Sequence, residues 1–459
     1  MNEQKETILV TGSSGSIGYP VAQRLSETFN VVGFDRKAPS HPPPSADCLY
    51  VDLTSEKSVQ RGLAAIRQLH GNHLAAVVHL AAYYDFLTPT NPLYDEITVQ
   101  GTARLLRLLQ DFEVEQFIFS STELVHAPSK PGQRLNEESP VKPSWGYPKS
   151  KINTEQVLRT QRGKIPVVML RIAGVYDDLC NSIPLAHQMQ RVYERDITAY
   201  LFPGDPSQGR QAYVHNDDVV DAILRAVDRR RTLPPEVALL IGEPESPSFE
   251  ELQGDFGRLI HGEAAKITRV PRWFARVGAV MQERLFGRPS FVKPWMVEFA
   301  TDNLELDISR ARATIGWEPK HRLLATLPLM AAALLADPAA FYRENELTPP
   351  LWLQAATPPP DPAIPAEMDR HQAMQMAEQL VGEITGQHES ATPAPMNNHA
   401  DHAAHGSNRS MDMPARQPKE PGAMPDMKMP KPQVNKPAGA MPDMDMPDMK
   451  PGMEMKENG

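Results

Sequence analysis

The chain has 459 residues, a length that fits about three domains, and its net charge of −10 argues against a protein that neutralises nucleic-acid phosphates. No apolar run approaches about 18 residues, so we expect no membrane-spanning helix and no association with a membrane. The N-terminus lacks a secretory-type apolar core, and Cys48 and Cys180 cannot make a disulfide framework. We therefore expect a cytoplasmic protein.

Short apolar runs alternate with amphipathic stretches through roughly the first 330 residues. The runs at 8–10, 31–34, 76–80, 117–120 and 166–170 have strand length, and residues 98–109 have the leucine spacing of a helix. Continuously apolar strands separated by helices indicate a parallel sheet that is covered on both faces. We therefore predict an α/β fold, a Rossmann-type doubly wound parallel sheet, with a smaller C-terminal substrate-binding lobe.

This pattern ends near residue 345. Residues 346–388 are predicted to be a proline-rich linker, in which 366–387 have the spacing of a short helix. Residues 389–459 contain almost no aliphatic side chain, so no core can offset the entropy of an ordered chain. We predict a disordered tail rich in methionine, proline and histidine.

A glycine-rich segment, T-G-S-S-G-S-I-G at residues 11–18, follows the first predicted strand and precedes a helical pattern. Glycine at 12 permits a tight turn, glycine at 15 lets the backbone approach a pyrophosphate, and glycine at 18 lets the helix pack on the strand. The helix N-terminus then offers free N–H groups to phosphate. The predicted cofactor contacts here are Gly12, Ser14, Gly15, Ser16, Ile17 and Gly18.

Asp35 ends the second predicted strand, where a dinucleotide-binding fold places an acidic ribose ligand. Its carboxylate would accept hydrogen bonds from both ribose hydroxyls and repel a 2′-phosphate, so we expect NAD as the cofactor. Arg36 follows directly, and it is either a contact for a 2′-phosphate or a solvated loop charge.

Together with later motifs, the T-G-x-x-G-x-x-G spacing resembles that of the extended short-chain dehydrogenases/reductases of the NAD-dependent epimerase/dehydratase family. The likeness covers roughly residues 6–330, within a domain at 1–345. It implies NAD binding mainly over 6–180, a substrate lobe mainly over 181–330 and a small-molecule substrate. The resemblance includes the segment R-Q-A-Y-V-H-N-D-D, which begins at Arg210. It also implies further cofactor contacts at Asp52, Leu53, Leu80, Ala81 and Ala82. A homodimer is left open.

Tyr147 and Lys151 lie four residues apart on a predicted helix and so share one face. A free tyrosine has a pKa of about 10, and we expect the Lys151 ammonium and the oxidised nicotinamide to lower it toward the working range. In the family, a hydroxyl residue at a strand end contacts the tyrosine and the substrate oxygen. Thr122 matches that position, with Ser121 as the alternative. Tyr147, Lys151 and Thr122 are the predicted catalytic residues, and the first two are also predicted to contact the cofactor.

The predicted substrate contacts are Tyr84, Glu123 and Arg210. Tyr84 either forms part of an aromatic substrate wall with Tyr83 and Phe86 or packs a loop. Glu123 is followed by Leu124, so the family's dehydratase acid pair is incomplete, although Glu123 alone could act as acid or base. Arg210 could bind a diphosphate or form a surface ion pair. Gly174 replaces the asparagine of the R-x-x-N motif that the family's nucleotide-sugar epimerases often carry.

These features predict an NAD-dependent epimerase or dehydrogenase acting on a hydroxyl group, plausibly of a nucleotide sugar. The alternative is a non-catalytic NAD(P)-sensing or scaffold protein that presents its tail to a metal or partner. The retained Thr122, Tyr147 and Lys151 favour the enzyme.

The tail is rich in methionine and histidine, whose side chains can bind soft metals. Its composition resembles that of Met/His-rich segments of bacterial copper-handling proteins. Thioether sulfur suits Cu(I) and imidazole suits Cu(II), nickel or zinc. No metal is expected in the core. The alternative is a flexible extension without a ligand, and the candidate tail ligands are His399, His402, His405, Met427, Met429, Met444 and Met446.

Overall fold

The computed structural model describes residues 5–39, 46–86, 88–277 and 293–356. Most of the predicted linker, the helix expected at 366–387 and the tail at 389–459, with all its histidine and methionine candidates, lie outside the described residues.

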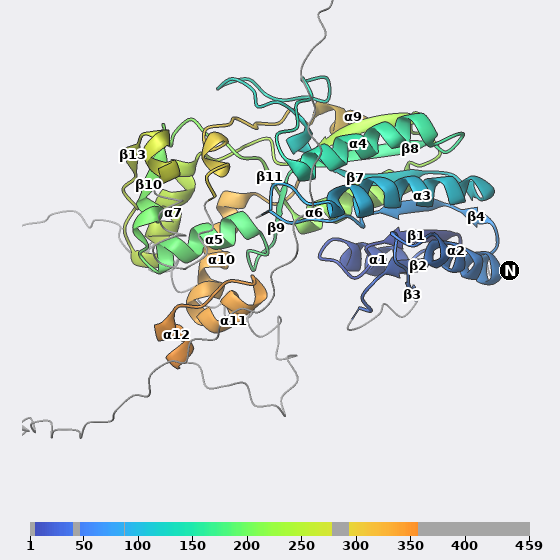
Figure 1. Cartoon of the computed structure of the whole chain (residues 1–459), viewed down its shortest axis with the longest axis horizontal. Helices are drawn as coiled ribbons and strands as arrows, with labels where there is room; N and C mark the ends of the chain where they lie inside the picture. Colours follow the sequence, from blue (N-terminus) through green and yellow to red (C-terminus); the bar gives the residue numbers. More distant parts are fainter. Residues whose placement is uncertain (1–4, 40–45, 87, 278–292, 357–459) are drawn as a thin grey trace, which may run out of the picture. The chain divides into compact units, whose positions relative to one another are not determined.

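Seven parallel strands form the central sheet, in the order β12-β8-β7-β5-β1-β2-β3 (Figure 1). Every strand predicted from an apolar run belongs to this sheet, which confirms the doubly wound architecture. The order reverses at β1, which pairs with β2 on one side and β5 on the other, and such a switch point opens a ligand crevice. The bounds are β1 Thr7–Thr11, β2 Asn30–Asp35, β3 Ala46–Tyr50, β5 Ala76–His79, β7 Phe117–Thr122, β8 Val167–Ile172 and β12 Glu236–Ile241.

Alternate side chains of each strand enter cores on opposite faces of the sheet, as the two-residue period of a strand requires. Ile8 and Val10 of β1 pack with α1 (Gly18–Ser26), α6 (Asn216–Asp228) and α9 (Ser309–Ile315). Leu9 packs with α2 (Glu56–His70), α3 (Gly101–Leu108) and α4 (Gly146–Gln161). Burial on both faces explains why the strands are continuously apolar.

The helix predicted over 98–109 begins with a π-helical segment, η1. The shorter elements are η1 Tyr94–Gln100, η2 Leu109–Asp111, η3 Glu123–Val125 and the strand pairs β4 His73–Leu74 with β6 Glu113–Val114 and β9 Gly174–Tyr176 with β11 Tyr213–His215.

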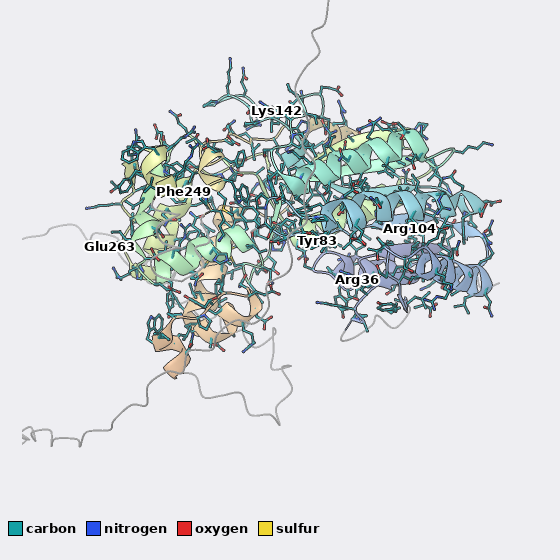
Figure 2. The ribbon with its side chains drawn as sticks, in the orientation of Figure 1. Arg36, Tyr83, Arg104, Lys142, Phe249 and Glu263 are labelled. Carbon is teal, nitrogen blue, oxygen red and sulfur yellow. The ribbon has the colours of Figure 1, made fainter. Side chains whose placement is uncertain are left out.

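The smaller lobe contains a third hydrophobic core, to which α5, α7, α10 and α11 contribute side chains. Its elements are α5 Ile183–Tyr193, η4 Ile197–Tyr200, β10 Leu201–Pro203, α7 Phe249–His261, β13 Thr268–Val270, η5 Met296–Glu298, α10 Leu323–Ala336, α11 Pro338–Glu344 and α12 Leu351–Ala356. Figure 2 shows Phe249 and Glu263 on the lobe, and Arg36 and Arg104 on the sheet side. Leu347 and Leu353, which follow the domain end predicted at residue 345, are also buried in this core.

No single described helix is long and apolar enough to span a membrane, and α10 and α11 reach that length only as a pair bent by 114°.

A buried ion pair joins α4 to the sheet. Arg171 of β8 donates from Nε to Glu155 Oε1 at 3.0 Å and from Nη2 to Glu155 Oε2 at 2.8 Å. Ser121 of β7 also donates to Glu155 Oε1, at 2.6 Å. Burial alone would raise the pKa of Glu155, but the hydrogen bonds and charge of Arg171 outweigh it and lower that pKa.

We expect Arg171→Met to destabilise the fold by about 3–5 kcal/mol, because it leaves the Glu155 carboxylate buried without its main counter-charge. Removing both charges in Arg171→Met/Glu155→Leu should cost less than the single change. Denaturant unfolding of the three proteins measures this, and a double variant less stable than Arg171→Met would contradict the expectation.

Candidate active site

The turn between β1 and α1 accepts only glycine at two of its positions. Gly12 has φ +70°, and a Cβ there would lie 2.8 Å from Ala81 N. A Cβ at Gly18, where α1 begins, would overlap Gly12 O. Gly12, Gly15, Ser16, Ile17 and Gly18 line the cavity, so bare backbone and a helix N-terminus face it. This cradle fits a dinucleotide pyrophosphate.

Asp35 stands beside the glycine turn at the end of β2. Its Oδ2 accepts from Ser14 N at 2.9 Å and its Oδ1 from Lys37 N at 3.0 Å, which fixes the carboxylate. Arg36 is exposed (Figure 2).

The residues predicted at the adenine lie after β3. The Asp52 Oδ1 accepts from Thr54 N at 2.9 Å and from Thr54 Oγ1 at 2.8 Å, which closes the turn before α2. Leu53 is buried, and its carbonyl accepts from Arg104. Neither Asp52 nor Leu53 lines the cavity.

His79 holds the end of β5 against β1. Thr11 Oγ1 and His79 Nδ1 are 2.7 Å apart, and His79 Nε2 and Thr102 Oγ1 are 2.8 Å apart. Because the Thr102 hydroxyl donates to Thr98 O, it accepts from Nε2–H, and Nδ1 therefore accepts from Thr11. Burial lowers the pKa of His79 to about 3, so the ring is neutral and structural. It fixes the start of the Leu80–Ala82 segment, of which Leu80 and Ala82 line the cavity.

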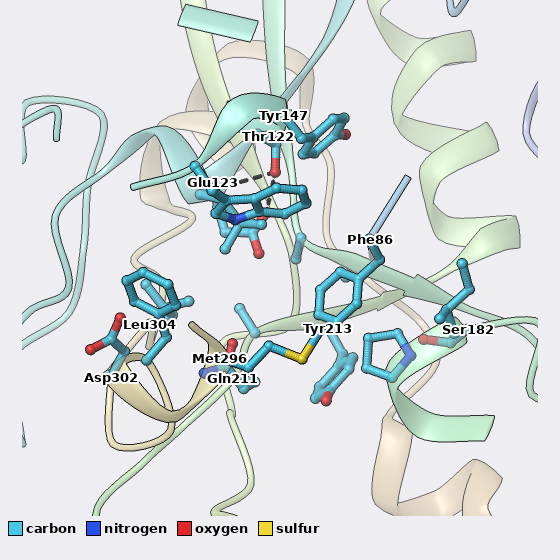
Figure 3. A pocket seen from close by; sticks show the side chains of 18 of the residues that line it. Phe86, Thr122, Glu123, Tyr147, Ser182, Gln211, Tyr213, Met296, Asp302 and Leu304 are labelled. Carbon is cyan, nitrogen blue, oxygen red and sulfur yellow. Dashed lines mark hydrogen bonds between the residues drawn. The ribbon is translucent and has the colours of Figure 1, made fainter. Parts of the chain in front are cut away.

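The structure brings the three predicted catalytic residues together. Lys151 Nζ donates to Ser120 O at 2.6 Å and lies 5.6 Å from the centre of the Tyr147 ring. Thr122 lies close enough to Tyr147 to lower its pKa slightly, and it donates to Glu123 Oε2 at 3.1 Å. Figure 3 shows Thr122, Glu123 and Tyr147 gathered at one wall of the cavity. Because Ser121 donates to Glu155 instead, its hydroxyl is already used, which favours Thr122 as the hydroxyl residue beside the tyrosine (Figure 3).

Burial favours the neutral form of every titratable group in this cluster. It raises the pKa of Glu123 to about 8 and lowers the pKa of Lys151 to about 7. It also raises the pKa of Tyr147, with Tyr84 and Glu123 adding to the effect. In the protein alone the pKa of Tyr147 is therefore raised and not lowered as expected, because burial is the largest influence on it.

One cavity of about 1800 Å³ runs from the glycine turn past Tyr147 and into the lobe. Pockets for one small molecule usually occupy about 300–1,000 Å³, so this volume has room for a dinucleotide and a second molecule. Tyr84 lines the cavity and packs edge-on against Tyr147, with ring centres 4.8 Å apart. Glu123 also lines it.

Arg210, the arginine predicted as a possible diphosphate ligand, points elsewhere. Arg210 donates from Nη1 to Ser246 O at 2.6 Å and pairs with Glu251 at 3.3 Å, and it does not line the cavity. These are the contacts of the ion-pair alternative, and the substrate contact of Arg210 stays a prediction. The segment that corresponds to the R-x-x-N motif runs from Arg171 to Gly174. Its arginine pairs with Glu155, and a Cβ at Gly174 would lie 3.2 Å from Ala212 O.

Sequence reasoning missed the lobe side of the cavity. Arg191, Gln211, Trp295 and Met296 line it. They come from three separate segments, and of these residues Gln211 lies in a motif that the sequence singled out, although not as a site residue. Only the fold brings these segments together.

Comparison with known proteins agrees with this geometry. The model of the NAD dependent epimerase/dehydratase family matches residues 8–242. A UDP-glucose 4-epimerase of Vibrio cholerae is 23% identical over 341 residues, covering 72% of this chain and 96% of that protein. An Escherichia coli O157:H7 N-acetyl-alpha-D-glucosaminyl-diphospho-ditrans,octacis-undecaprenol 4-epimerase is 32% identical over 162 residues, which are 35% of this chain and 45% of that protein.

A solved structure, the Thermus thermophilus UDP-glucose 4-epimerase in complex with NAD, has the same fold. It superposes with a TM-score of 0.53 at 22% identity, covering 71% of this chain and 97% of that one.

The chain belongs to the NAD-dependent epimerase/dehydratase family of extended short-chain dehydrogenases/reductases. It is an NAD-dependent enzyme of that type, and its substrate is a small molecule.

We expect NAD to bind at least about ten-fold more tightly than NADP, a difference of about 1.4 kcal/mol, because the fixed Asp35 carboxylate would repel a 2′-phosphate. Asp35→Ser should remove most of this preference. Asp47→Ser, a change at an exposed aspartate on the neighbouring β3, should keep it. Calorimetric titration with both cofactors is the measurement, and equal affinities in the unchanged protein would show that Arg36 outweighs Asp35.

Glu123 should make the stability depend on pH. Its folded pKa of about 8 lies above the ordinary value of 4.5, so its contribution is complete below pH 4.5 and is lost as the pH rises through about 8. We expect Glu123→Gln to reduce the fall in Tm between pH 5 and pH 8. Glu263→Gln, at an exposed position of the lobe, should leave the fall unchanged. An identical fall in both variants would show that Glu123 is ionised when folded.

Proposed function

We propose that this enzyme moves a hydride between a carbinol carbon of its substrate and NAD, with Tyr147 as the acid–base group. When bound, NAD supplies the hydride acceptor. Tyr147 takes the hydroxyl proton as the carbinol carbon is oxidised, and Thr122 positions the reacting oxygen by hydrogen bonding. The observation that carries the proposal is the gathering of Thr122 and Tyr147 (Figure 3) with Lys151 at the switch-point crevice.

Lys151 is proposed to hold the cofactor ribose and to stabilise the tyrosinate. Its buried Nζ has Ser120 O and Oγ as acceptors among the described residues, which leaves donor capacity for ribose hydroxyls. A cation close to the phenol favours its ionised form, and the positive charge of oxidised nicotinamide would act in the same direction.

The outcome depends on the fate of the hydride after the oxidation step. Delivery of the hydride to the opposite face of the carbonyl carbon gives an epimer, whereas release of the reduced cofactor gives net dehydrogenation. The relatives named as UDP-glucose 4-epimerases favour epimerisation and suggest a nucleotide sugar. The contacts of Arg210 give no support to the diphosphate part of that substrate.

Tyr147→Phe should lower kcat by about 10²–10⁴-fold, because the reacting hydroxyl loses its proton acceptor. NAD affinity should change little, since the ring remains in place. The control is Tyr50→Phe, at an exposed tyrosine of β3, which should keep full activity.

The assay is formation of NADH or of the epimer with the first substrate found among nucleotide sugars, sterol-like alcohols and sugar alcohols. Full activity of Tyr147→Phe would refute the role of Tyr147. Tight NAD binding without turnover of any of these compounds would favour the sensing alternative.

A further inference from the structure

The cavity wall opposite the glycine turn is built from aromatic rings of three separate segments. Phe86 precedes η1, Trp145 precedes α4 and Trp295 precedes η5. The Trp145 and Trp295 ring centres are 5.4 Å apart, and Phe86 lies 5.8 Å from Trp145 and 6.1 Å from Trp295. All three line the cavity, which places a continuous apolar surface next to Tyr147.

The lobe continues this apolar lining away from the reactive cluster. Phe202 and Phe249 have ring centres 4.6 Å apart, and both line the cavity. Figure 3 shows Phe86, Tyr213, Met296 and Leu304 around the same space. The far end of the cavity is therefore walled mainly by carbon.

The charges of the described lining do not suit a dianionic ligand. The cations are Lys142, Lys151 and Arg191, against the carboxyl groups of Glu123, Asp196, Glu298 and Asp302. Lys151 belongs to the reactive cluster, and Lys142 is exposed. Among the described lining residues, that leaves the Arg191 guanidinium within the lobe, whereas a diphosphate would be held best by several bidentate cations.

Arg191 is a poor anchor for a diphosphate on its own. Its Nε donates to His187 O at 3.3 Å, and burial lowers its pKa to about 10, with Asp196 opposing that shift. Burial also raises the pKa of the lining Asp302 to about 6. The lobe end of the cavity thus penalises added charge of either sign.

The apolar lining reaches the surface. Ile197 is 73% exposed, Phe274 is 49% exposed and Ile183 is 36% exposed, although all three line the cavity. Apolar residues that are exposed at a cavity mouth are typical of a site for an apolar ligand.

Trp295 adds one polar feature to this wall. Its Nε1 is buried and has no hydrogen-bond partner among the described residues. A buried indole N–H usually finds an acceptor, so this donor is an unusual polar atom within an otherwise apolar wall.

We infer that the substrate carries its reacting hydroxyl on a largely apolar, uncharged body, a polycyclic or long-chain hydrocarbon skeleton, and not on a nucleoside diphosphate. The inference rests on the proposed function for the position of the hydroxyl beside Tyr147. The apolar body then extends past Phe86 and Trp295 into the lobe, toward the mouth at Ile197.

The test compares ligands on the NAD-loaded full chain. A 3-hydroxysteroid, a long-chain secondary alcohol and UDP-glucose are titrated by calorimetry, and formation of NADH or of the epimer is followed with each. We expect at least one apolar alcohol to bind ten-fold or more tightly than UDP-glucose. Tighter binding of UDP-glucose, or no saturable binding of either apolar alcohol, would overturn the inference.

Variants locate the binding. Trp295→Ala and Met296→Arg should each lower the affinity for the apolar ligand by ten-fold or more. The first removes part of the apolar wall, and the second buries a charge in it. The matched control is Trp273→Ala, because Trp273 is 66% exposed and does not line the cavity. Unchanged affinity in both lining variants would place the ligand elsewhere and overturn the inference.

Binding and chemistry are separated by Tyr147→Phe. This variant should still bind the apolar alcohol while forming no NADH. Apolar binding without turnover even in the unchanged enzyme would support the inferred substrate body and contradict the proposed function. Turnover of UDP-glucose, with no apolar alcohol bound, would support the proposed function and refute the inferred body.

Discussion

The buried ion pair between Glu155 and Arg171 is the contact on which the position of the reactive residues depends. Tyr147, Lys151 and Glu155 follow one another at four-residue intervals on α4 and so share one face of the helix. Glu155 anchors the inner end of that face to β8 through Arg171 and to β7 through Ser121. Because the carboxylate is buried, rotation or sliding of α4 would leave a charge unpaired, and the helix keeps its register.

That register leads directly to the geometry of the cluster. Lys151 reaches the carbonyl of Ser120, one residue before the serine that holds Glu155, and Tyr147 reaches Thr122 at the end of the same strand. Three successive residues of β7 thus meet three successive turns of α4. Helix and strand hold each other through polar contacts that are shielded from water, where hydrogen bonds count for most.

The same burial sets the protonation of the site. Desolvation raises the pKa of Tyr147 and Glu123 and lowers the pKa of Lys151, so the protein alone keeps its reactive groups close to neutral. Chemistry at Tyr147 then depends on positive charge that the cofactor brings. A lobe lined by Phe202, Phe249 and Met296 extends the same low polarity toward the substrate.

The sequence by itself determined the local features. Apolar runs predicted the strands, glycine spacing predicted the turn at Gly12, and the four-residue spacing of Tyr147 and Lys151 predicted their shared helix face, because each depends on neighbours along the chain. Tertiary structure alone decided how Arg171 and Arg210 are used, which hydroxyl meets Tyr147, and how Phe86, Trp145 and Trp295 combine into one wall. Those outcomes depend on contacts between distant segments, and burial, which sets the pKa values, exists only once those segments have packed.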